Sequence, residues 1–197
     1  MAEIFLLSDH HFNHANIIKF AGRDGNLIRP GFESIEHMNE TIIENHNKVV
    51  KPGDKVYFGG DMGKRFGDFL HRMNGRKRLI QGNHDDKLSR GELASFDKIL
   101  SWRFFGHLSK NMVVSHYPLH PMSFTYRGTP RDAETMGTAE PNCWNVHGHI
   151  HEKLVKLDNG HVDTRYFNIS CEHMNYTPIH IEDLINKLGK PQPLRNE

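Results

Sequence analysis

The chain has 197 residues, a length that one domain of ordinary size accounts for, and we predict a single domain over residues 1–197. Hydrophobic residues make up 37% and charged residues 25%, which is typical of a globular protein and excludes a disordered one. The formal net charge of +1 argues against a broad basic surface, so extended nucleic-acid binding is not expected. With no apolar stretch of membrane-spanning length and no basic leader, we expect a cytoplasmic protein without a membrane partner, and its oligomeric state stays open.

Apolar runs and a helical pattern alternate in the first part of the chain. Apolar residues that recur every three or four positions, or by whole turns, predict an amphipathic helix within residues 34–50, with Ser34 as its candidate N-cap. Short apolar runs bounded by polar or glycine residues are typical of buried strands in an α/β sheet. Such runs predict strands over residues 3–8, 54–60, 78–81 and 111–115.

The later part of the chain carries hairpin and loop signals. Asn159-Gly160 lies between two alternating runs and predicts a β-hairpin within residues 153–170. Residues 181–188 predict a closing helix, and residues 123–142 contain several turn formers and predict a long loop. Strands that alternate with helices early, followed by a hairpin, predict an α/β fold with a mixed sheet layered with helices.

Ligand-type side chains follow five short apolar runs. In open α/β sheets ligands bind beyond the carboxyl ends of the strands, so we expect these five clusters to meet at one edge of the molecule. The clusters are Asp9, His10 and His11; Asp61; Asn83, His84 and Asp85; His116; and His147, His149 and His151.

These clusters supply carboxylate and amide oxygens together with imidazole nitrogens. Such donors suit divalent transition ions, with manganese preferred and iron, zinc, nickel or cobalt as alternatives. One ion with open coordination positions cannot use every candidate ligand, so we predict two divalent ions. The candidate metal ligands are Asp9, His11, Asp61, Asn83, His116, His149 and His151.

Five blocks carry a resemblance to a known group of proteins: Asp9-x-His11, Gly60-Asp61, Gly82-Asn83-His84-Asp85, His116 and Gly148-His149-x-His151. In this order they resemble the signature of the calcineurin-like metallophosphoesterase superfamily, and the short chain resembles its small bacterial and phage phosphoesterases more than its large nucleases. The resemblance spans residues 9–151. It implies an α/β fold in which two mixed β-sheets pack as a sandwich flanked by helices, in four αββα layers.

The resemblance also implies a role for the residues of each block. One ion would be held by Asp9, His11 and His151, and the other by Asn83, His116 and His149. Asp61 would bridge the two ions. His84 would stay unligated and face the substrate as a catalytic residue, and Asp85 would orient its ring. The ions would activate water and neutralise phosphoryl charge, while His84 would protonate the leaving oxygen or stabilise the developing charge.

Three residues outside the metal blocks are candidate substrate-binding residues. His14 follows the first block, and Arg23 and Arg29 lie in the glycine-rich segment after it, where guanidinium groups could bind phosphate oxygens. A solvated loop side chain is the alternative for each of the three. In the 123–142 loop, which could border the pocket, the candidate contacts are Tyr126, Arg127 and Arg131.

The aromatic residues Trp102, Phe104 and Phe105 follow one another closely in the sequence. Side chains of this kind are more often packed in a core or against a sheet than used to stack nucleic-acid bases. We therefore expect all three to serve packing.

Together these observations predict a metal-dependent phosphohydrolase that acts on a small phosphoester, more readily a phosphodiester or nucleotide diester than a monoester. A monoester brings two negative charges and usually needs cationic side chains in addition to the metal ions. Arg23 and Arg29 are the two cations assigned to this task. A nuclease is one alternative, disfavoured because no added nucleic-acid-binding domain is visible. A metal-binding module without turnover is another, disfavoured because the complete ligand set is joined by His84.

Overall fold

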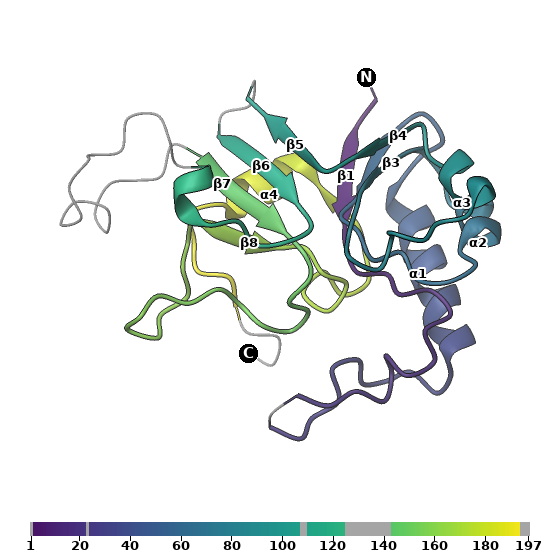
Figure 1. The fold of residues 1–197 in the computed structure, drawn as a ribbon, viewed down its shortest axis with the longest axis horizontal. Coiled ribbons are helices and arrows are strands. Elements are labelled where there is room, and N and C mark those ends of the chain that lie inside the picture. The colour runs from purple at the N-terminus through teal and green to yellow at the C-terminus, as the bar shows by residue number, and fades with distance from the viewer. Residues whose placement is uncertain (1, 23, 107–109, 125–142, 194–197) are drawn as a thin grey trace.

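Two mixed β-sheets pack face to face, and helices flank them (Figure 1). The structure is a computed structural model and describes residues 2–22, 24–106, 110–124 and 143–193. The predicted α/β class, with two sheets packed as a sandwich, is confirmed. Within the described ranges, no helix has both the length and the apolar character needed to cross a membrane.

The first sheet contains β1 (Ile4–Leu7), β2 (Lys55–Phe58), β3 (Arg76–Ile80), β4 (Lys98–Leu100) and β9 (Ile179–His180). Its strand order is β4-β3-β2-β1-β9, in which β9 alone runs antiparallel to its neighbour. Leu7 lies opposite Phe58, and Phe58 lies opposite Leu79. The segments that follow β1, β2 and β3 therefore leave the sheet at the same edge.

The second sheet contains β5 (Trp102–Phe105), β6 (Asn111–Ser115), β7 (Cys143–His147) and β8 (Tyr166–Asn168), in that order. β6, β7 and β8 run parallel, and β5 pairs antiparallel with β6 at the edge. A bridge between Ser8 and Ser170 joins the segment after β1 to the segment after β8. The two sheets are thus linked at the carboxyl ends of their parallel strands.

The outer side of the first sheet is covered by α1 (Ile35–Val49), α2 (Gly67–Arg72) and α3 (Arg90–Ala94), which lie together in Figure 1. The predicted cap of α1 is confirmed, because Ser34 Oγ accepts a hydrogen bond of 3.1 Å from the His37 N–H. Met38 and Ile42 of α1 pack in one core with Leu7. Each large apolar side chain buried in this way stabilises the fold by about 1.5–3 kcal/mol.

Successive side chains of β1 point alternately into the core between the two sheets and into the core beneath the helices. Leu6 faces inward and packs with Val114 and Val146 of the second sheet, whereas its neighbour Leu7 faces the helices. The predicted closing helix is α4 (Ile181–Lys187), which contributes to the inner core. Over the outer face of the second sheet lies the short 3₁₀ helix η1 (Pro121–Ser123), after which Phe124 packs with Val113.

The predicted hairpin at Asn159-Gly160 is only partly formed. A turn is present, with the Leu157 N–H donating to the His161 carbonyl at 2.9 Å, but one isolated bridge takes the place of two paired strands. The chain after this turn forms β8, which pairs parallel with β7 and buries Tyr166 and Phe167. Pairing with β7 buries more apolar surface than a free hairpin could, which accounts for the difference.

Candidate metal centre

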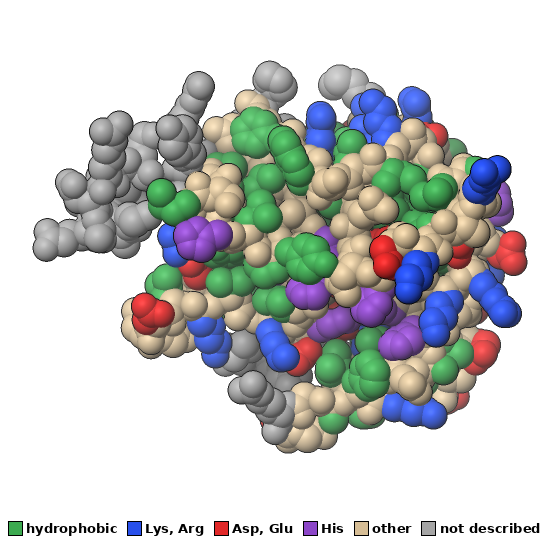
Figure 2. Space-filling model, in the orientation of Figure 1, with side chains coloured by type: hydrophobic (Ala, Val, Ile, Leu, Met, Phe, Trp, Pro, Cys, Tyr) green, Lys and Arg blue, Asp and Glu red, His purple; other side chains and the backbone are tan. Residues whose placement is uncertain are grey.

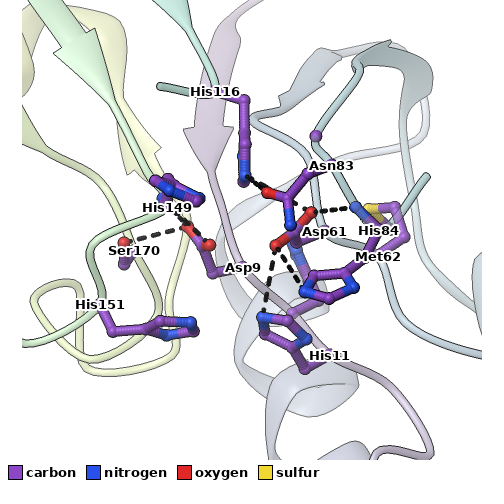
Figure 3. A network of polar contacts seen from close by, with 12 residues as sticks. Asp9, His11, Asp61, Met62, Asn83, His84, His116, His149, His151 and Ser170 are labelled. Carbon is purple, nitrogen blue, oxygen red and sulfur yellow. Dashed lines mark hydrogen bonds and ion pairs between the residues drawn. The ribbon is translucent and has the colours of Figure 1, made fainter. Parts of the chain in front are cut away.

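Ligand-type side chains from both sheets meet at the edge where the parallel strands end (Figure 3). The predicted convergence is observed for members of all five clusters, whereas His10 and His147 are buried beside Phe58 and Tyr166 and belong to neither group of candidate ligands. The side chains that meet are Asp9 and His11 after β1, Asp61 after β2, Asn83 and His84 after β3, His116 after β6, and His149 and His151 after β7.

The first group of candidate ligands is Asp9, His11 and His151, whose ligand atoms all lie within 4.8 Å of one another. The Asp9 carboxylate accepts hydrogen bonds from the His149 N–H at 3.0 and 3.1 Å. Burial and the charge of Arg29 lower the pKa of His11 to about 3. His11 is therefore neutral at pH 7, the form in which imidazole binds metal ions.

The second group is Asp61, His116 and His149, with ligand atoms again within 4.8 Å of one another. His116 Nδ1 lies 2.9 Å from the Gly59 carbonyl, to which it donates, so Nε2 is left facing the site. Asn83 Oδ1 lies 3.1 Å from His116 Nε2 and joins this group. All four residues were predicted from the sequence as metal ligands.

The Asp61 carboxylate lies between the two groups. Its Oδ1 is 3.4 Å from His116 Nε2, and its Oδ2 is 3.7 Å from His11 Nε2. Burial alone would raise the pKa of Asp61, but the hydrogen bond and charge of His116 lower it to about 2. One ionised carboxylate thus presents an oxygen to each group (Figure 3).

The chemistry of these donors fits divalent cations. Carboxylate and amide oxygens together with imidazole nitrogens suit first-row transition ions. His11 Nε2 is buried and has no hydrogen-bond partner among the described residues, an arrangement that costs free energy unless something binds that nitrogen. A cation beside His11 would satisfy it.

The backbone at the site is held in an uncommon conformation. Positive φ angles of 51–70° occur at five of the candidate ligands: Asp9, His11, Asp61, His149 and His151. Each costs roughly 1–3 kcal/mol outside glycine, and such residues concentrate at functional sites. Glycine is required beside them, since a Cβ on Gly148 would lie 2.2 Å from Asp9 Oδ2.

The predicted role of Asp85 is wrong. Its carboxylate accepts hydrogen bonds of 2.8–3.0 Å from the backbone N–H groups of Asp61, Met62 and Gly82 and does not orient the His84 ring. Asp85 lies behind the backbone, where it can satisfy three amide groups at once. Its function is to hold the Asp61 segment in place.

Arg29 is not placed to bind a substrate phosphate, which corrects that prediction. Its guanidinium is fully buried and donates to Glu172 Oε1 at 2.7 Å, to the His10 carbonyl at 2.9 Å and to the Asp9 carbonyl. Glu172 Oε1 also lies 2.9 Å from His151 Nδ1, which leaves His151 Nε2 for a metal ion. Burial alone would raise the pKa of Glu172, but the charge of Arg29 and the hydrogen bond with His151 hold it well below its ordinary value.

Sequence reasoning missed Glu172, although a signal for it existed. Glu172 follows the apolar strand β8, just as the other clusters follow their strands. The hairpin prediction concealed that pattern. Lys64 is a second residue near the site: its backbone N–H donates to the Phe12 carbonyl at 2.8 Å, and its charge, after burial, lowers the pKa of His14.

The remaining predicted residues lie at the rim or outside the described ranges. His84 is exposed, with Nε2 4.0 Å from Asp61 Oδ2, and its own N–H donates to Asp61 Oδ1 at 3.0 Å. His14 is half-buried, and its ring lies 5.6 Å from that of His11. The residues outside the described ranges are Arg23, Tyr126, Arg127 and Arg131, together with positions 125–142 of the predicted loop.

The expectation that Trp102, Phe104 and Phe105 all serve packing is wrong for two of them. Phe105 is buried in the core between the sheets. Trp102 and Phe104, on the edge strand β5, are 59% and 47% exposed. Successive side chains of a strand point to opposite faces of the sheet, so Trp102 and Phe104 point to the outer face while Phe105 points into the core.

By its fold and its site, the chain is an α/β protein with two groups of candidate metal ligands between two sheets. No family model matches it. It is 30% identical over 202 residues to the uncharacterized protein MJ1445 of Methanocaldococcus jannaschii. The alignment covers 99% of this chain and 96% of that protein. The chain therefore belongs to the same protein family as MJ1445.

Solved structures add a close match in fold and a distant one. A protein of unknown function from Aquifex aeolicus, AQ665, matches with a TM-score of 0.63 and 28% identity over 95% of this chain and all of that chain. A phosphoesterase from Escherichia coli, YfcE, matches with a TM-score of only 0.38 and 13% identity, over 85% of this chain and 78% of that chain. The second likeness is too low to carry an argument about activity.

Proposed function

We propose that this protein is a metal-dependent phosphohydrolase of the calcineurin-like metallophosphoesterase superfamily, which hydrolyses a small phosphoester at a dinuclear centre. The observation that carries the proposal is the position of Asp61, with one carboxylate oxygen 3.4 Å from His116 and the other 3.7 Å from His11. A carboxylate that belongs to both groups is the part that a two-ion site requires and a pair of unrelated sites does not.

In this proposal each ion has its own set of ligands. One ion would be held by Asp9, His11 and His151, the other by Asn83, His116 and His149, and Asp61 would contribute to both. Two such ions supply an activated water and neutralise the charge of the phosphoryl group. The protein fixes the position of both ligand sets through the hydrogen bonds of Asp85, Gly59 and Glu172.

His84 is the candidate proton donor. Its ring is 63% exposed at the rim of the site, so a substrate can reach it, and its backbone N–H is fixed to Asp61. A histidine in this position can give a proton to the leaving oxygen or stabilise the charge that develops there. Asp61 and His11, and not Asp85, are the described neighbours of this ring: Asp61 Oδ2 lies 4.0 Å from His84 Nε2, and the His11 ring lies 5.7 Å away in an edge orientation.

A phosphodiester is the preferred substrate in this proposal. A monoester dianion needs cationic side chains beyond the two ions, and the burial of Arg29 removes one of the two arginines assigned to that task. After burial, the charges of Lys64 and Arg29 lower the pKa of His14, and of these two cations Lys64 is the exposed one. One lysine is a weaker clamp for a dianion than a pair of guanidinium groups.

The test compares metal binding with turnover in the purified protein. Manganese titrated into metal-free protein should bind at two equivalents, and bis(4-nitrophenyl) phosphate should be hydrolysed faster than 4-nitrophenyl phosphate, with both activities lost on chelation. Full activity with less than one equivalent of metal would overturn the dinuclear centre. Two bound ions without turnover would support the binding module, and preferred cleavage of long oligonucleotides would support the nuclease.

A further inference from the structure

An apolar cavity of about 540 Å³ lies on the outer face of the second sheet, between β5 and the segment around η1. It is lined by Trp102, Phe104, Val113, Leu119 and Phe124, together with His116 and Tyr117 at one end. No Asp, Glu, Lys or Arg is among the described residues that line it. The cavity is therefore suited to an uncharged apolar group.

The pairing of β5 with β6 explains why two large aromatic side chains stand on this face. Trp102 lies opposite Ser115, and Phe104 lies opposite Val113. Phe105, the residue after Phe104, points to the opposite face of the pleat and packs in the core between the sheets. Trp102 and Phe104 consequently share the outer face and remain 59% and 47% exposed.

The cavity adjoins the candidate metal centre at His116, a residue that belongs to both. Tyr117 follows directly on His116, and its ring lies 5.0 Å from the His116 ring and 4.6 Å from the His149 ring. His116 itself lines the cavity while its Nε2 faces Asp61. On this face of the molecule, hydrophobic side chains extend down to the cluster of histidines (Figure 2).

We infer that this cavity is a binding subsite for a neutral, planar aromatic group of the substrate, such as a nucleobase or an aryl group. Exposed Trp, Tyr and Phe rings offer flat apolar faces on which such groups stack, largely without regard to their hydrogen-bonding edges. The location rests on the proposed function, because the phosphate would lie at the ions and the aromatic group would extend past Tyr117. Binding of the aromatic group can nevertheless be measured without turnover.

The first experiment compares three monoesters that share a phosphate and differ in their organic group. Thymidine 5′-monophosphate, phenyl phosphate and methyl phosphate are titrated calorimetrically into the manganese-loaded protein. The two aromatic ligands should bind more tightly than methyl phosphate. In Trp102→Ala their dissociation constants should rise by about 5- to 150-fold, the range for losing one stacking side chain. The dissociation constant of methyl phosphate should stay the same.

Two further variants serve as checks on this experiment. Phe104→Ala tests the same face independently and replaces Trp102→Ala should that variant fold poorly. Leu157→Ala is the control: like Trp102 and Phe104, Leu157 is a large exposed apolar side chain, at 43%, but it lies outside the cavity. This variant should change none of the three dissociation constants. Tighter binding than methyl phosphate by thymidine 5′-monophosphate alone would identify a subsite for a nucleobase. Tighter binding by both aromatic ligands would identify a general aryl subsite. Equal binding of all three ligands, or an equal loss for all three in Trp102→Ala, would overturn the subsite.

The second experiment uses the two tryptophans of the chain. Trp102 is exposed and Trp144 is buried, so acrylamide should quench Trp102, and Trp102→Phe isolates the signal of Trp144. Free thymidine should protect Trp102 from acrylamide even in metal-free protein. Protection in a protein that neither binds manganese nor hydrolyses bis(4-nitrophenyl) phosphate would keep the subsite and contradict the proposed function. A Trp102 signal that is already shielded in the free protein would show that the chain itself fills the cavity, and would overturn the inference.

Discussion

The two groups of candidate ligands are supported in different ways. Behind the first group lies a buried ion pair, in which Arg29 binds Glu172 and Glu172 binds the ring of His151. Behind the second group the ring of His116 is fixed by the neutral carbonyl of Gly59. A carboxylate partner increases the basicity of a ligand imidazole, whereas a carbonyl chiefly fixes its tautomer and orientation. We therefore expect the first group to bind its ion more tightly than the second.

The largest expected effect comes from removing the residue that the two groups share. Asp61→Ala should lower the affinity for both ions and abolish phosphodiester hydrolysis, because each ion loses a ligand. The measurement is calorimetric titration with manganese, together with turnover of bis(4-nitrophenyl) phosphate. One ion that still binds as in the wild type would show that the two groups are independent.

The next largest effect should come from His84, and it should leave both groups intact. His84→Ala should lower turnover by roughly 10²- to 10⁴-fold, the range for losing a positioned proton donor. The metal content, measured by elemental analysis, should stay at the wild-type value. A loss of metal would make His84 a ligand and would contradict its position at the rim.

A smaller effect, confined to one group, is expected from Glu172. Glu172→Gln should reduce the affinity for one of the two ions by about 10- to 100-fold and leave the other unchanged. Glu3→Gln is the matched control, because Glu3 Oε2 also contacts a histidine, His180, at 3.0 Å, but lies at the surface away from the site. An equal loss at both ions would mean that Glu172 supports the whole site and that the comparison between the groups fails.

The smallest effect is expected from Ser170. Its hydroxyl lies 3.0 Å from Asp9 Oδ2 and 2.6 Å from Asn168 Oδ1, so Ser170→Ala removes one polar partner behind the first group. The free energy of unfolding should fall by about 1 kcal/mol, measured by urea denaturation of the metal-free protein. The affinity for the ion at the first group should fall by a smaller factor than in Glu172→Gln. A larger change would place Ser170 among the principal supports of Asp9.

The candidate ligands could be predicted from the sequence because their signal is local. A short apolar run followed by Asp, Asn or His indicates a strand end, and parallel strands bring their ends together. The helix over Ile35–Val49 was predictable for the same reason, since both its cap and its apolar spacing lie within a few residues. In these regions the short-range pattern and the tertiary structure agree.

The supports of the site could not be predicted, because they join residues that are distant in the sequence. Arg29 and Glu172 are 143 positions apart, and nothing around Arg29 distinguishes a buried ion pair from a solvated loop arginine. Asp85 follows His84 directly, yet the backbone amides behind it determine where its carboxylate points. The exposure of Trp102 could not be predicted either, because it depends on which face of β5 is covered, and that is decided by tertiary packing and not by the local sequence.

Each ligand group takes members from both sheets. Asp9 and His11 follow a strand of the first sheet and His151 one of the second, while Asp61 faces His116 and His149 across the same boundary. An ion bound by either group would therefore crosslink the two sheets. At a free concentration 1,000 times its dissociation constant, one such ion would add about 4 kcal/mol to the free energy of unfolding. Metal loading would then set how firmly the two halves of the molecule hold together.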